Sequence, residues 1–96
     1  MTSSREILLI LKNQRDKLFS RYPIKSLAMF GSFARNEAGE SSDLDILVEF
    51  NNKIGIRFID LADELESITG VKVDLVSRKG IKEKYFKSIE RDLIYV

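Results

Sequence analysis

Residues 30–48 decide the fold, and they read FGSFARNEAGESSDLDILV. The stretch holds a Gly31-Ser32 pair near its start and an acidic pair, Asp43 and Asp45, near its end, with ten residues between Ser32 and Asp43. The apolar run before the Gly-Ser pair favours a buried strand that leads into a tight turn. Beyond the acidic pair, apolar residues occupy every second position, which predicts a strand with one apolar face. We therefore expect two strands joined through this segment. The Gly-Ser pair follows the first strand and the acidic pair lies at the start of the second.

The rest of the chain is typical of a small α/β (α+β) protein. Ser3 and Glu6 have the spacing of a capping box, and Pro23 ends the helical periodicity that follows them. Gly70 stands where a left-handed residue would end a later amphipathic helix. The patterns predict helices over about 4–21, 32–37, 58–68 and 81–89, strands over 24–30, 43–50 and 71–76, and a possible edge strand over 93–96. We expect a small mixed β-sheet flanked by helices, in the order α-β-α-β-α-β-α, within one domain spanning residues 1–96.

Three aspartates are candidate metal ligands. Residues i and i+2 of a strand share a face, so Asp43 and Asp45 are expected side by side, where their charges repel unless a cation offsets them. Asp74 lies in the third expected strand, and a neighbouring strand could place it beside the pair. Three carboxylates can hold two ions, an arrangement known to serve phosphoryl and nucleotidyl transfer. The alternative is that the acids form a solvated strand face or cap a helix.

Gly31 and Ser32 are candidate phosphate ligands. Glycine permits close approach of the backbone, and a serine hydroxyl adds a donor without adding negative charge. A Gly-Ser pair is also common in ordinary turns, so this interpretation depends on the aspartates.

Composition narrows the chemistry. With 16 Lys and Arg against 15 Asp and Glu, the net charge of +1 predicts no global attraction to nucleic acid. The sequence has no Cys and no His, which excludes thiol chemistry, disulfides and imidazole ligands and leaves oxygen ligands that suit Mg²⁺ or Mn²⁺. No apolar run approaches the roughly 20 residues that span a bilayer, so we expect a cytoplasmic protein with no membrane partner.

The segments 30–35, 41–48 and 71–76 together resemble the signature of the DNA polymerase beta-like nucleotidyltransferase superfamily. In length the chain resembles the minimal nucleotidyltransferases (MNT), which commonly serve as antitoxins beside HEPN-domain ribonuclease toxins. The resemblance implies that Gly31 and Ser32 bind the triphosphate and that Asp43, Asp45 and Asp74 bind the metal. It also implies that Asp74 helps to deprotonate the acceptor hydroxyl.

The same resemblance implies transfer of AMP from ATP to a hydroxyl, expected to be a tyrosine, of a HEPN toxin encoded nearby. Enzyme and toxin could then form a hetero-oligomer. Arg35 falls where the family often has a basic residue that contacts phosphate, although an ion pair with Glu37 or Glu40 is equally compatible with the sequence. An antitoxin that masks the toxin by contact alone remains the alternative. A nucleic-acid module is disfavoured because acids interrupt the basic residues of the C-terminal tail.

Overall fold

The computed structural model describes residues 3–96, and its helices and strands follow the expected order with two additions at the C-terminus. The last strand confirms the edge strand considered from the sequence, and a short 3-10 turn precedes it. The elements are α1 (Ser4–Arg21), β1 (Ile24–Phe30), α2 (Gly31–Ala34), β2 (Leu44–Phe50), α3 (Arg57–Thr69), β3 (Val73–Ser77), α4 (Glu83–Ile89), the 3-10 turn η1 (Glu90–Asp92) and β4 (Ile94–Tyr95).

Local signals set the ends of the two long helices. The Ser3 side chain accepts a hydrogen bond from the backbone N–H of Glu6, so α1 begins with the expected cap. Gly70 ends α3 in the left-handed conformation with φ 74°, also as expected. The short helix is one turn, Gly31–Ala34, rather than 32–37. It stops early because Asn36 adopts a positive φ of 58°.

The sheet has four strands in the order β3-β2-β1-β4. Strand β1 pairs antiparallel with both β2 and β4, whereas β2 and β3 run parallel. Within this ladder Phe30 lies opposite Asp45, and Asp45 lies opposite Asp74. The register therefore brings the end of β1, the start of β2 and the start of β3 together at the same end of the sheet.

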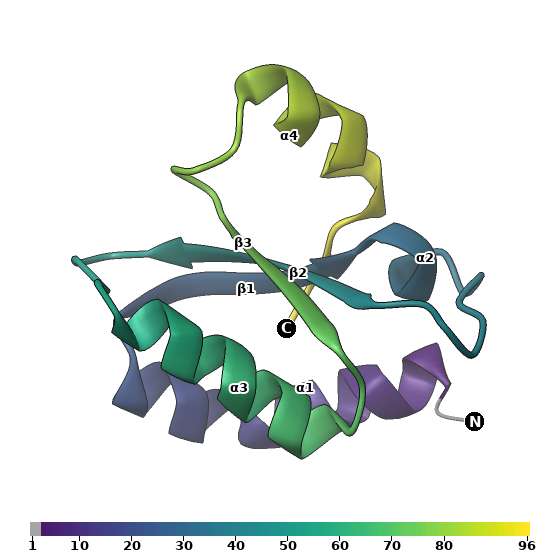
Figure 1. Ribbon diagram of the computed structural model, residues 1–96, viewed down its shortest axis with the longest axis horizontal. Coiled ribbons are helices and arrows are strands. Elements are labelled where there is room, and N and C mark those ends of the chain that lie inside the picture. The colour runs from purple at the N-terminus through teal and green to yellow at the C-terminus, as the bar shows by residue number, and fades with distance from the viewer. Residues whose placement is uncertain (1–2) are drawn as a thin grey trace.

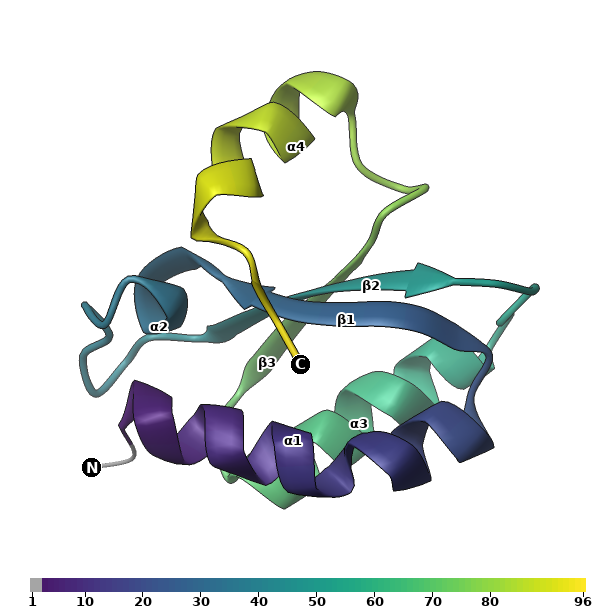
Figure 2. The same cartoon turned by 180° about the vertical axis from the view of Figure 1, so that it is seen from behind.

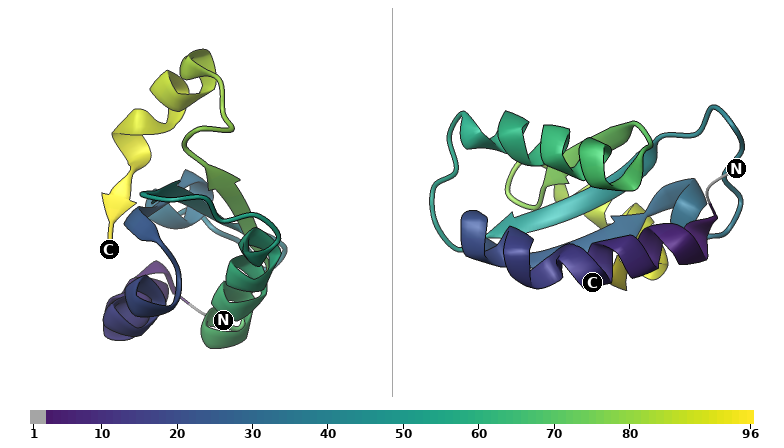
Figure 3. Two further views of the ribbon diagram at one scale, coloured as in Figure 1. Left: turned by 90° about the vertical axis from the view of Figure 1, so that its left-hand side faces the viewer. Right: turned by 90° about the horizontal axis from the view of Figure 1, so that it is seen from below.

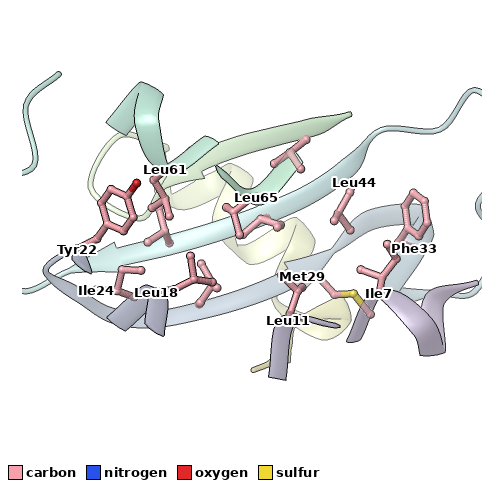
Figure 4. Packing of buried hydrophobic residues seen from close by; sticks show 14 residues of the cluster. Ile7, Leu11, Leu18, Tyr22, Ile24, Met29, Phe33, Leu44, Leu61 and Leu65 are labelled. Atoms are coloured by element: carbon pink, nitrogen blue, oxygen red, sulfur yellow. The ribbon is translucent and has the colours of Figure 1, made fainter. Parts of the chain in front are cut away.

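Helices α1 and α3 lie side by side under one face of the sheet (Figures 1 and 3). Their apolar side chains point up into the sheet and meet side chains from the undersides of β1 and β2 (Figure 4). Burial of this face anchors the strands that carry the aspartates. The buried members of this cluster are Ile7, Leu11, Leu18, Tyr22, Ile24, Leu27, Met29, Phe33, Leu44, Ile46, Val48, Leu61, Leu65 and Val73.

The opposite face of the sheet is partly covered by α4 and the C-terminal segment, which Figure 2 shows from behind. Leu47, expected on the acidic, non-core face of its strand, is buried there with Phe30 and Ile89. That expectation of one apolar face was incomplete, because α4 folds back over β2 and gives the sheet a second, smaller core. Within residues 3–96 no helix is both long and apolar enough to cross a bilayer.

Candidate active site

Gly31 and Asp45 are packed against each other at the end of β1. Gly31 has φ 73°, a conformation that other residues rarely adopt. A Cβ built on Gly31 would overlap Oδ2 of Asp45. The backbone angle thus favours glycine at this position, and any Cβ there would force the Asp45 carboxylate to move.

Ser32 follows in the single turn of α2. Phe30, not Ser32, is the capping residue of this helix, and no side-chain hydrogen bond closes its N-terminus. The N–H groups of a first helical turn have no partner within the helix. The turn therefore leaves backbone N–H donors without helical partners directly after Gly31, the residue that packs against the Asp45 carboxylate.

Asp45 and Asp74 are direct neighbours on the parallel strands β2 and β3. Burial raises the pKa of Asp45, the negative charges of Asp74 and Asp43 raise it further, and a proton on Asp45 can be hydrogen-bonded to Asp74. The charge of Arg35 opposes this increase. The sequence suggested that a neighbouring strand could bring Asp74 to the acidic pair, and the register confirms it.

Asp43 lies just outside the strand that carries Asp45: it precedes β2, which starts at Leu44, and it is exposed. Its negative charge nevertheless acts on the Asp45 carboxyl. Across residues 3–96 no three Asp, Glu, His or Cys side chains converge tightly enough to form a ready-made metal site. The donor set nevertheless suits a hard cation, because Asp45 is destabilised in its charged form by two neighbouring carboxylates whose repulsion a cation would offset.

Arg35 is held by two acids at the end of α2. Its Nε donates to Oε1 of Glu37 and its Nη1 donates to Oδ2 of Asp92, each over 2.8 Å. Of the two partners considered from the sequence, the structure selects Glu37 and not Glu40. Asp92 was missed, because a contact across 57 residues leaves no local sequence signal.

A cavity at the far end of β2 contains none of the predicted site residues. Its lining includes Glu49, Asn52, Lys53, Ser77 and Lys79. The expected ligands instead gather at the opposite end of the same strand, around Asp45. The structure thus brings Gly31, Asp45 and Asp74 together, with Ser32 next to Gly31 in the chain, and the charges of Asp43 and Arg35 act on Asp45.

Comparison with known proteins identifies the family. Residues 11–96 match the family described as a nucleotidyltransferase domain. The chain is 49% identical over 98 residues to a candidate protein adenylyltransferase of Methanocaldococcus jannaschii, MJ0128, with 100% of both proteins covered. It is 35% identical to a solved candidate minimal nucleotidyltransferase, with TM-score 0.74 and coverage of 91% of this chain and 93% of that chain.

The fold also recurs in a solved complex of a tri-AMPylated Shewanella oneidensis HEPN toxin with an MNT antitoxin. There the TM-score is 0.67 at 22% identity, over 93% of this chain and 70% of that chain. The position of Asp45 and Asp74 beside the Gly31-Ser32 turn agrees with the family assignment. The chain therefore belongs to the nucleotidyltransferase domain family, and the relative MJ0128 is described as a candidate protein adenylyltransferase.

Proposed function

We propose that this enzyme transfers AMP from ATP to a tyrosine hydroxyl of a HEPN ribonuclease toxin, depends on Mg²⁺, and acts as that toxin's antitoxin. One observation carries the proposal: Asp45 pairs in register with Asp74 while its carboxylate packs against Gly31 of the Gly-Ser turn. This arrangement supports a site that combines acids with backbone donors for an anion. That combination suits a triphosphate accompanied by a divalent cation.

Each residue has a distinct proposed role. The Ser32 hydroxyl and the neighbouring backbone N–H groups bind phosphate oxygens, and Arg35 supplies positive charge at the margin. Asp43, Asp45 and Asp74 would hold Mg²⁺, with Mn²⁺ as a possible substitute. When bound, the ion supplies charge stabilisation for the phosphoryl oxygens and the leaving group.

The chemistry is a single displacement. The acceptor oxygen forms a bond to the α phosphorus while the bond from that phosphorus to the bridging α,β oxygen breaks, and pyrophosphate leaves. Asp74 is exposed on its strand and is the carboxylate that we assign to receive the hydroxyl proton. The enzyme itself forms no covalent bond to AMP.

The proposal of a HEPN toxin as partner is supported by what is known of similar proteins. MJ0128 is described as a candidate protein adenylyltransferase, and the Shewanella oneidensis complex pairs an MNT antitoxin with an AMPylated HEPN toxin. A modified tyrosine near the toxin's RNA site would add charge and bulk that oppose RNA binding. The second candidate function is an antitoxin that masks its toxin by contact without transfer.

The double variant Asp43→Asn with Asp45→Asn separates the two candidates. It keeps side-chain size and removes two carboxylate charges, while Leu44, Ile46 and Val48 keep their places in the core beneath the sheet. Co-expression with the neighbouring toxin, followed by intact mass of the toxin and cell growth, is the measurement. An enzyme should lose transfer by orders of magnitude, because each 1.36 kcal/mol of lost stabilisation is about tenfold in rate.

Asp16→Asn is the matched control, because Asp16 lies fully exposed on α1, away from the site. The control and the wild type should both give toxin with added AMP and growing cells, and the double variant should give neither. Growth restored by the double variant, with unmodified toxin in every case, would leave only the masking function.

A further inference from the structure

An ion pair between Arg35 and Asp92 connects the C-terminal segment to the proposed nucleotide site. Nη1 of Arg35 donates to Oδ2 of Asp92 over 2.8 Å, and Nε of the same guanidinium donates to Glu37. The two acids differ in setting: the Asp92 side chain is 25% exposed, whereas that of Glu37 is 64% exposed. Asp92 is therefore the more firmly placed partner.

The fold fixes Asp92 on both sides of the residue. It closes η1, and Leu93 directly after it packs against the second core around Phe30 and Leu47. Ile94 then pairs with Met29 of β1. Figures 1 and 2 both show this yellow segment descending beside α2. The strand that ends at the Gly-Ser turn thus also positions the segment that carries Asp92.

The two acids leave most of the guanidinium available. A guanidinium has five N–H donors in a rigid plane, and the contacts with Glu37 and Asp92 use one on Nε and one on Nη1. The Arg35 side chain is 45% exposed, so its remaining donors are open to a ligand. Two planar contacts restrict the rotation of a side chain that is otherwise rich in rotamers.

We propose that Asp92 is a positioning residue, which orients the Arg35 guanidinium toward the β and γ phosphates of the bound nucleotide. This inference rests on the proposed function, because it assumes a triphosphate at the Gly31-Ser32 turn. The C-terminal segment would then contribute to nucleotide binding through Asp92, which does not touch the nucleotide and acts only by orienting Arg35. The competing view is that Asp92 withdraws Arg35 from the ligand, in which case removing Asp92 would strengthen binding.

The test is a double-mutant cycle on the full chain with Asp92→Asn, Arg35→Gln and both together. Calorimetry with ATP and Mg²⁺, compared with AMP, gives the affinities, and thermal melts report the fold. We expect Arg35→Gln to weaken ATP binding roughly tenfold to a hundredfold, the usual effect of losing a hydrogen bond to a charged group. Asp92→Asn should weaken it roughly threefold to tenfold, because the donors remain but are less well oriented.

Three features of the result identify a positioning role. The loss should be confined to ATP, since AMP lacks the β and γ phosphates. Adding Asp92→Asn to Arg35→Gln should cause no further loss. Asp16→Asn, the same chemical change at a remote exposed site, should bind ATP as the wild type does. If Asp92→Asn unfolds the protein, Arg35→Lys serves instead, because it keeps the charge but loses the planar fork and should weaken ATP binding with an unchanged Tm.

Results that contradict the positioning role of Asp92 can be distinguished from results that contradict the proposed function. Wild-type affinity for ATP in Asp92→Asn, tighter binding, or losses that add to those of Arg35→Gln would each overturn the positioning role while leaving the adenylyltransferase proposal intact. Absence of any ATP binding by the wild type in the presence of Mg²⁺ would overturn both.

Discussion

The carboxylate of Asp45 lies so close to Gly31 that a Cβ on Gly31 would overlap its Oδ2 and lie 3.1 Å from its Cγ. Asp45 is on β2 and Gly31 follows β1, so the contact crosses the antiparallel pair in which Phe30 faces Asp45. The Gly31-Ser32 turn and Asp45 are therefore packed as one unit. Changes in one are expected to displace the other.

Gly31→Ala should destabilise the protein and abolish transfer. The positive φ alone costs a non-glycine residue about 1–2 kcal/mol. Overlap with Asp45 adds a steric cost typical of overpacking, about 1–3 kcal/mol. Urea unfolding and the co-expression assay measure the two effects.

Gly55→Ala is the matched control for that experiment. Gly55 also has a positive φ, 59°, but a Cβ there meets nothing within 4 Å. It should therefore show the backbone cost without the steric one. Equal destabilisation by the two substitutions would contradict the contact between Gly31 and Asp45.

Ser32→Ala should weaken ATP binding while leaving the fold intact. Loss of one hydrogen bond to a charged group costs about 1.5–3 kcal/mol. Because Phe30 occupies the capping position of α2, the serine hydroxyl is not needed to start the helix. Calorimetry and a thermal melt together test this, and a lower Tm with unchanged affinity would show that the hydroxyl is structural.

Asp45→Asn should stabilise the metal-free protein at neutral pH. Burial, with the charges of Asp74 and Asp43, raises the pKa of Asp45 above its usual 3.8. The native state then binds this proton more tightly than the unfolded chain, so the free energy of unfolding falls as pH rises from about 3.8 through the higher native pKa. Above the native pKa of Asp45, the ionised carboxylate lowers the free energy of unfolding by its full amount.

The gain from Asp45→Asn should therefore be largest at neutral pH and shrink in acid, below about 3.8, where both states carry the proton. Urea unfolding in EDTA at several pH values measures it against wild type. Asp16→Asn, exposed and remote, should show no comparable pH-dependent gain. A gain independent of pH would contradict the raised pKa of Asp45, and with it both the burial and the charge repulsion that raise it.

Mg²⁺ should raise the Tm of the wild type, because a cation offsets the carboxylate repulsion only in the native state. Such a ligand stabilises by about 2.7 kcal/mol at a hundred times its Kd. Asp45→Asn combined with Asp74→Asn should abolish the increase, and EDTA should reverse it in the wild type. An increase that survives the double substitution would place the ion elsewhere.

The local parts of this protein were predictable from sequence. Helix α1 spans residues 4–21 and β1 spans 24–30, as expected, because the cap at Ser3 and the break at Pro23 act on adjacent residues. The left-handed end of α3 at Gly70 is equally local. The spacing between the Gly-Ser pair and the two aspartates was sufficient to indicate the family that the comparisons show.

The sequence by itself thus determined the order of elements and most of their ends, and it indicated the candidate site residues apart from Asp92. Only the tertiary structure decided that Asp45 pairs with Asp74, that Leu47 is buried under α4, and that Arg35 is held by Asp92. Caps and turns depend on neighbours a few residues apart, and their energies are encoded in short patterns. Strand register and long-range ion pairs depend on how the two faces of the sheet are packed as a whole, which no short stretch of sequence specifies.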